Sequence, residues 1–357
     1  MSDVREMLRE SVTRMFSEKV DRQLRHDAED GSLPVDLWRL VEQSGFTRVL
    51  VPENAGGTGG GWPDAYPLIH AVGYHQAPVP LAETAIGNHL LSMAQLALGD
   101  GPLALVEQDE TTLRLDLRDG RLVIDGTAKS VPWARTVNQI VLSGSVKGRQ
   151  VIARVRRNQP NVAVTKGENM AKEPRDAISF TECAAEEFAY SGESATSHPV
   201  VTFGALARAI AMVGAAESAL AQSIQYAKDR TQFGRAIAKF QAVQHMLAVL
   251  ACEVGAAKTA VEGACTAAAP HFRIQTAVAK IRAGYAAGAA ARIAHQIHGA
   301  IGMTQEHGLH FATRRLWSWR SEYGNEATWA QEIGADAIRR GGQRFWSDLT
   351  LRTAAPE

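Results

Sequence analysis

The sequence predicts a mostly helical protein with a β domain between two helical regions, that is, an α+β fold. Apolar residues recur with helical spacing over roughly the first hundred residues, and period-two alternation replaces that spacing after about Pro102. From Val200 onward, alanine-rich stretches favour long helices. A chain of 357 residues can bury a large core and divide into domains. We therefore expect domains at 1–101, 102–195 and 196–357.

The N-terminal region is expected to consist of helices around a glycine-rich loop. Helical spacing through Leu37 to Val41 stops at Ser44 and Gly45, where glycine suits a helix C-cap. A glycine-rich loop follows at 56–61, and Pro63 suits the first turn of the next helix. A further helix is expected over 82–98.

The middle region is expected to be a small antiparallel β domain. Apolar and charged residues alternate from Leu113 to Leu117, as in a half-buried strand. Further short strands are expected at 122–124, 140–143, 151–155, 162–164 and 178–180. Turns are expected at Asp119-Gly120, Asp125-Gly126 and Lys147-Gly148.

The C-terminal region is expected to be a helical bundle. Its long helices are predicted at 201–229, 239–269 and 271–298, with a shorter one at 326–342. Pro270 should end one helix and begin the next. The many alanines allow helices to pack closely, as in a four-helix bundle.

Composition excludes several classes of partner. With 38 basic and 38 acidic residues, the net charge is zero, so nothing indicates binding to nucleic acid or to a membrane surface. No apolar run approaches the ~20 residues that span a bilayer, and the charged N-terminus lacks the apolar core of a secretory signal. Three widely spaced cysteines fit reduced thiols. We therefore expect a cytoplasmic protein.

Two short segments carry the functional prediction. The first runs from Arg230 to Gly234 and the second, about sixty residues later, from Gln296 to Gly302. A planar guanidinium such as that of Arg230 can hold a pyrophosphate with two hydrogen bonds. Taken singly, each residue is more commonly a solvated helix end or a cap. The set predicts a dinucleotide site with these contacts: Arg230, Gln232, Phe233, Gln296, Gly299 and Gly302.

The other members of the set suit the remaining parts of such a ligand. Gln232 and Gln296 can form hydrogen bonds with phosphate or adenosine atoms, and Phe233 offers apolar surface to an adenine or flavin ring. Gly299 and Gly302 let the backbone approach closely. His295 and His298 are three residues apart and could share a metal, but no third ligand has usable spacing. We therefore predict no metal site.

In their order and separation, these two segments resemble the flavin-binding half of the acyl-CoA dehydrogenase family. Leu50 to Glu53 with the following glycine loop resembles its N-terminal domain, and Asp119 to Lys129 resembles the start of its β domain. The resemblance thus covers nearly the whole chain. It implies a helical N-terminal domain, a small β domain, a C-terminal four-helix bundle, and FAD contacts made across a subunit interface.

Compared with the family, this chain lacks a recognisable catalytic base. The family reaction needs a carboxylate base against the α carbon of an acyl-CoA thioester. The expected position, just before Gly324, holds Tyr323, and a phenol with a pKa near 10 is a poor base. The alternative position falls at Gly204 and Ala205. Only Glu322 and Glu326 remain as candidates for the base.

The flavin-ring elements of the family are also hard to recognise. Catalytic members carry a Trp-Ile-Thr stretch in the β domain. The corresponding stretch here runs from Val131 to Ala134 and contains Trp133. The β-domain segments that would hold the isoalloxazine ring are therefore in doubt. The two C-terminal segments that would reach toward a partner's FAD are present.

The chain is therefore similar to the non-catalytic subunit of heterotetrameric, sterol side-chain type bacterial acyl-CoA dehydrogenases. This resemblance implies a homologous catalytic subunit that supplies the glutamate, an acyl-CoA substrate such as a steroid side-chain thioester, and an electron-transfer flavoprotein as acceptor. Two alternatives stay open. One is a self-sufficient homotetramer that uses Glu322 or Glu326, and the other is a scaffold subunit without flavin.

Overall fold

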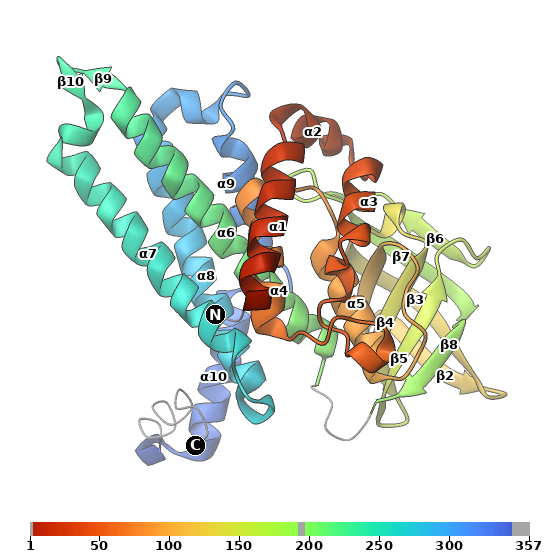
Figure 1. The fold of residues 1–357 in the computed structure, drawn as a ribbon. Coiled ribbons are helices and arrows are strands. Elements are labelled where there is room, and N and C mark those ends of the chain that lie inside the picture. Colours follow the sequence, from red (N-terminus) through yellow and green to blue (C-terminus); the bar gives the residue numbers. More distant parts are fainter. Residues whose placement is uncertain (1–2, 192–196, 345–357) are drawn as a thin grey trace. The chain divides into compact units, whose positions relative to one another are not determined.

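The computed structural model describes residues 3–191 and 197–344 (Figure 1). The chain divides into two compact units, Met1–Gly204 and Ala205–Glu357. Helices come first, then two sheets, then helices again, so the α+β fold predicted from the sequence is confirmed. The finer domain boundaries expected at 101 and 195 stay a prediction.

The N-terminal helices surround the apolar residues that the sequence pattern singles out. They are α1 (Asp3–Lys19), α2 (Arg22–Asp27), α3 (Val35–Gln43), α4 (Trp62–His75) and α5 (Leu81–Met93). Helix α3 ends at Ser44 and is followed by Gly45 with φ of 73°, as a glycine C-cap predicts. Pro63 lies in the first turn of α4. Helix α5 ends five residues earlier than the expected 98, since it stops at Met93.

The β region forms two four-stranded sheets. The first has the order β1 (Leu103–Glu107), β4 (Gln139–Val146), β5 (Arg149–Arg156) and β8 (Glu187–Tyr190). The second has the order β2 (Leu113–Arg118), β3 (Arg121–Pro132), β7 (Arg175–Ala184) and β6 (Val162–Thr165). Each predicted strand lies within one of these, and all neighbours are antiparallel except β1 and β4, which are parallel. Helix α5 packs against β1, β4 and β5.

One predicted turn is wrong. Asp125-Gly126 lies inside β3, where a bulge interrupts the pairing with β7 between Ile124 and Gly126. Gly126 is needed there because its φ is 121° and a Cβ would lie 2.2 Å from the carbonyl oxygen of Thr112. The glycine therefore marks a close approach of two backbones within the sheet. The expected turns at Asp119-Gly120 and Lys147-Gly148 are confirmed, with positive φ at all four residues.

The C-terminal helices form a bundle around α8. They are α6 (Pro199–Asp229), α7 (Gln241–Cys265), α8 (Ala269–His298), α9 (Leu309–Ser321) and α10 (Glu326–Arg340). Helix α8 contacts α7, α9 and α10. Pro270 lies in the first turn of α8, and α7 ends at Cys265, before the expected 269. Helix α9 was not predicted from the sequence.

Helix α6 is long and apolar enough to cross a membrane by length and composition alone, which the search for apolar runs in the sequence did not anticipate. However, 94% of its most apolar 18-residue window is buried in the protein. Apolar residues on all sides of a helix are expected when it is covered by neighbours. We therefore interpret α6 as a core helix.

Candidate functional site

The first predicted segment forms a hairpin at the end of α6. Strand β9 (Thr231–Gln232) pairs with β10 (Arg235–Ala236), and Phe233 and Gly234 form the two-residue turn between them with φ of 52° and 76°. Two positive φ values are typical of a type I′ turn. At the base of the hairpin, the N–H of Ile237 donates to the carbonyl of Arg230 over 2.9 Å. Figure 1 shows the hairpin beyond the ends of α6 and α7.

The polar and aromatic groups of this hairpin face solvent. Arg230 and Gln232 are exposed, and Phe233 is 92% exposed. Within residues 3–191 and 197–344, no hydrogen bond or ion pair engages the Arg230 side chain. The Gln232 amide donates only to the neighbouring carbonyl of Thr231. The hairpin therefore presents a guanidinium and an aromatic ring that are open to a ligand.

The second predicted segment closes helix α8. Gln296 is exposed on the last turn, and Gly299 follows with φ of 62° at the start of the 3₁₀ turn η6 (Gly299–Met303). Gly302 is buried, and a Cβ there would lie 2.9 Å from Cβ of His298 and 3.2 Å from Leu309. Only glycine fits this position without moving its neighbours. The glycine spacing thus keeps η6 folded tightly against the end of α8.

The structure brings the two segments to the same end of the bundle. Tyr226, one turn before Arg230 on α6, stacks on His298 of α8 with ring centroids 4.6 Å apart and planes 23° from parallel. His307, which follows η6, lies 4.6 Å from the His298 ring. Tyr226 and His307 were not singled out from the sequence. The sequence signal that could have identified Tyr226 is its position one helical turn before Arg230.

The histidines beside η6 have lowered pKa values because they are partly buried and close together. Burial lowers the pKa of His295, His298 and His307, and the neighbouring histidines lower those of His295 and His298 further. Nδ1 of His298 contacts the carbonyl of Ala294 at 2.8 Å, and Nε2 of His295 contacts the Thr313 hydroxyl at 2.9 Å. In the described part of the chain, no group of three or more His, Cys, Asp or Glu could hold a metal.

These lowered pKa values predict acid sensitivity. Histidines with a pKa below 6.5 in the folded chain take up protons more readily when it unfolds, so stability falls as pH drops below about 6.5. His75, whose pKa burial lowers to about 4, acts in the same direction in the N-terminal unit. We expect Tm to fall between pH 7.5 and 5, and to fall less steeply in a His307→Gln variant. Equal slopes for the two proteins in a thermal melt would contradict this.

The first candidate base, Glu322, is held in an ion pair. It follows α9, and Nε of Arg208 on α6 donates to its Oε2 over 2.6 Å. Both side chains are largely buried, at 7% exposed for Arg208 and 15% for Glu322. Tyr323 and Gly324 come next, with φ of 55° and 92°. Glu322 is therefore part of a partly buried ion pair and is not displayed as a free carboxylate.

The second candidate base, Glu326, is also paired. It begins α10, and Nε of Arg320 donates to its Oε1 over 2.7 Å. Behind both carboxylates lies Lys280 of α8, which is 1% exposed. Burial lowers the pKa of Lys280 to about 8, and the charges of Glu326 and Glu322 oppose that shift. The turn between α9 and α10 is thus an ion-pair network rather than an open carboxylate.

The β-domain tryptophan lies in the core. Trp133 is 4% exposed, has φ of 61°, and donates its backbone N–H to the carbonyl of Pro174 over 3.3 Å. It packs with Val131, Ala134 and other buried residues of the sheets. Its ring is therefore enclosed within the sheet region rather than displayed on the surface.

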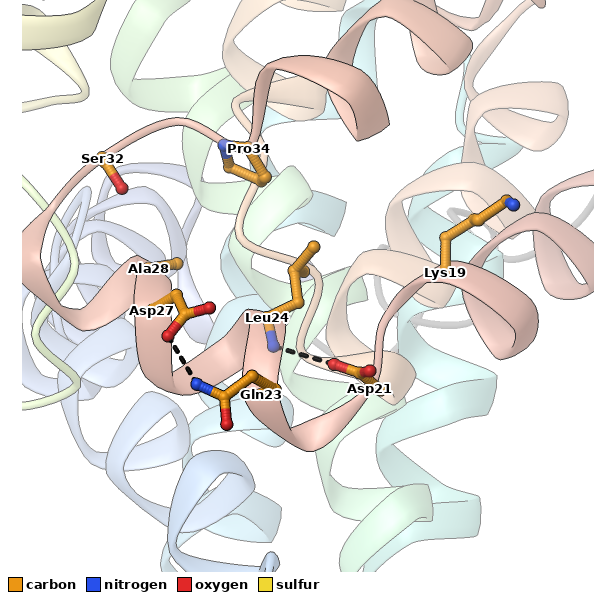
Figure 2. Close-up of a pocket in the computed structure, with 8 residues that line it drawn as sticks. All are labelled: Lys19, Asp21, Gln23, Leu24, Asp27, Ala28, Ser32 and Pro34. Atoms are coloured by element: carbon orange, nitrogen blue, oxygen red, sulfur yellow. Dashed lines mark hydrogen bonds between the residues drawn. The ribbon is translucent and has the colours of Figure 1, made fainter.

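A surface pocket of about 370 Å³ lies in the N-terminal unit (Figure 2). Its lining residues are Lys19, Asp21, Gln23, Leu24, Asp27, Ala28, Ser32 and Pro34. Asp21 accepts the N–H of Leu24 at the start of α2, and Asp27 accepts the Gln23 amide. Both carboxylates thus stabilise local structure, and none of the predicted site residues lines this pocket.

The residues at the end of the bundle fit the adenosine-diphosphate half of FAD. Arg230 offers an exposed guanidinium, Gln232 and Gln296 offer exposed amides, and Phe233 offers a ring. The buried Trp133 and the paired Glu322 do not fit a flavin ring or an acid–base role. Comparison with known proteins identifies the family of the chain.

Residues 2–100 match the acyl-CoA dehydrogenase N-terminal domain, and residues 195–336 match the acyl-CoA dehydrogenase C-terminal domain. The acyl-CoA dehydrogenase IpdE2 of Mycobacterium tuberculosis is 30% identical over 324 residues, which cover 87% of this chain and 90% of IpdE2. The chain belongs to the acyl-CoA dehydrogenase family. The predicted family and the oxidoreductase class are thereby confirmed, and FAD is the cofactor of this family.

Solved structures show the same fold. The ChsE4-ChsE5 complex from Mycobacterium tuberculosis has a TM-score of 0.83 at 21% identity, covering 94% of this chain and 97% of that chain. A structure described as the Tcur3481-Tcur3483 steroid ACAD G363A variant has a TM-score of 0.80 at 22% identity, covering 95% and 98%. Both descriptions name two proteins together.

Proposed function

We propose that this chain is the non-catalytic subunit of a heteromeric acyl-CoA dehydrogenase, and that it contacts FAD seated mainly on a homologous catalytic partner. The observation that carries the proposal is the contrast between two parts of the C-terminal unit. The side chains of Arg230, Gln232, Phe233 and Gln296 are exposed. In contrast, both candidate carboxylates are held by guanidinium groups. The partner supplies the glutamate base and most of the acyl-CoA pocket.

In this proposal each exposed residue has one task. Arg230 binds the pyrophosphate with its planar guanidinium, and Gln232 and Gln296 bind phosphate or adenosine oxygens and nitrogens. Phe233 covers a ring of the cofactor and excludes water from it. Gly299, which is exposed and has no neighbour within 4 Å of a Cβ position, allows the backbone at the start of η6 to approach the cofactor. Gly302 supports this turn by packing against His298 and Leu309. The bound flavin supplies the acceptor for the hydride that leaves the β carbon of the acyl group.

The substrate is proposed to be an acyl-CoA thioester with a steroid-type acyl group. This is supported by the description of one similar structure as a steroid ACAD and by similarity to a complex of two such chains. An electron-transfer flavoprotein is the proposed acceptor of electrons, and the cytoplasm is the proposed location. The two-chain structures likewise support a homologous partner subunit.

The test against a self-sufficient enzyme uses the two candidate bases. In the complex with its partner, Glu322→Gln and Glu326→Gln should keep kcat within about two-fold, because the base lies on the other subunit. A general base contributes about 100-fold or more to the rate. A loss of that size in either variant would contradict the proposal and favour the homotetramer.

Glu332→Gln is a matched control for this test. Glu332 also accepts from an arginine, Arg273, and its side chain is 32% exposed, compared with 16% for Glu326. Its replacement measures the cost of breaking an ion pair between helices of the same unit. A small activity loss shared by all three variants therefore reports on structure and not on proton transfer.

A further inference from the structure

At the tip of the hairpin, a bulky aromatic residue adopts a backbone conformation that is unfavourable for its type. Phe233 has φ of 52°, where type I′ turns prefer asparagine, aspartate or glycine, and its side chain is 92% exposed. Such strain persists only where the surroundings hold it and is common at binding sites. The position of the Phe233 ring then depends on the aromatic residue that it meets within the hairpin.

The aromatic neighbour of Phe233 is Phe240. The rings of Phe233 and Phe240 meet edge to face, with centroids 6.1 Å apart and planes at 86°. Phe240 is itself anchored, because its carbonyl accepts the N–H groups of Val243 and Gln244 at the start of α7. Its own N–H donates to the carbonyl of Ile237 over 3.1 Å. The Phe240 ring is thus a platform attached to the first turn of α7.

Arg235 covers this platform. Its guanidinium carbon lies 4.3 Å from the Phe240 centroid, a cation–π geometry. Among residues 3–191 and 197–344, no carboxylate pairs with Arg235. Arg235 follows the two-residue turn and pairs with Gln232 on the opposite strand of the hairpin. Arg235 therefore packs on a ring in preference to forming an ion pair.

We propose that Arg235 is a positioning residue for the cofactor: by stacking on Phe240 it fixes Phe233 in the orientation that receives the FAD ring system. This proposal rests on the proposed function above. An exposed aromatic ring that is already ordered loses less conformational freedom when a ligand binds. Removing the stack should therefore weaken FAD binding even though Arg235 itself need not touch the cofactor.

The experiment is a double-mutant cycle on FAD affinity, measured with the complex of this chain and its catalytic partner. Arg235→Met and Phe240→Leu should each weaken FAD binding about 3- to 10-fold. The double variant should be no weaker than Phe240→Leu alone, because Arg235 acts only through that ring. Arg235→Lys should restore part of the affinity, since an ammonium also favours the ring face.

Two matched variants separate the possible outcomes. Lys239→Met removes an exposed cation from the same segment and should leave FAD affinity within about two-fold. Additive losses in the cycle, or no loss with Arg235→Met, would overturn the positioning role. Arg230→Ala tests the proposed function separately: if it weakens binding while Arg235→Met does not, only the present inference fails. If Arg230→Ala also has no effect, the proposed FAD contact fails as well.

Discussion

Replacing Lys280 with methionine is expected to lower the free energy of unfolding by about 3–5 kcal/mol, because three backbone carbonyls would lose a charged donor. Nζ of Lys280 donates to the carbonyls of Trp319, Arg320 and Gly324 over 3.2, 2.7 and 2.8 Å. The first two carbonyls end α9, where no further N–H of the helix can reach them. Methionine would fill the space but leave these oxygens without a donor, and a buried polar group without a partner costs free energy.

Urea unfolding of the purified protein measures this prediction, with Lys258→Met as control. Lys258 pairs with Glu217 over 3.1 Å, but its side chain is 44% exposed, so its loss should cost less than about 1 kcal/mol. Similar changes for the two variants would show that Lys280 does not hold the α9–α10 turn. The position of Glu322 in its ion-pair network could then not be explained by the hydrogen bonds of Lys280.

Replacing Arg230 with alanine is expected to weaken FAD binding to the heteromeric complex about 10- to 150-fold. This range follows from the roughly 1.5–3 kcal/mol that a hydrogen bond to a charged group contributes. Since Arg230 is exposed and its side chain makes no hydrogen bond or ion pair among the described residues, its loss should change the stability of the chain little. The dissociation constant of FAD, from titration of the apo complex, is the measurement.

Lys228→Ala provides the control for Arg230→Ala, because Lys228 is an exposed cation on the last turn of α6. Its effect on FAD affinity should stay within about two-fold if the arginine acts by direct contact. The interpretation as a scaffold without flavin predicts instead that Arg230→Ala changes nothing. An unchanged dissociation constant would therefore favour the scaffold.

Local patterns allowed most of the helices to be predicted. Alanine-rich sequence and Pro270 gave α6 and α8 to within two residues at their starts and at the correct final residues. Helix α9 was missed although it contains strong helix formers, since its buried residues also include Phe311, Thr313 and Trp319, which have modest helix propensity. Its helical form depends on packing against α8, which no local pattern reports.

In the candidate site, too, local features could be predicted from the sequence, whereas contacts between distant residues could not. The FAD-type residues lie in two short segments, so their chemistry could be read directly from sequence. The pairing of Arg208 with Glu322 joins residues 114 positions apart, and Lys280 meets carbonyls about 40 positions away. Such contacts leave no local pattern. The sequence therefore suggested that the base is absent, and the structure adds that Glu322 and Glu326 are both held in ion pairs.

This chain is proposed to form half of a flavin site, and the most direct test is to measure bound FAD per chain together with native mass. The chain should be measured alone and after coexpression with a homologous catalytic subunit. The proposal predicts little flavin in the chain alone and about one FAD per pair of unlike chains in a heterotetramer. One FAD per chain in a homotetramer would contradict it.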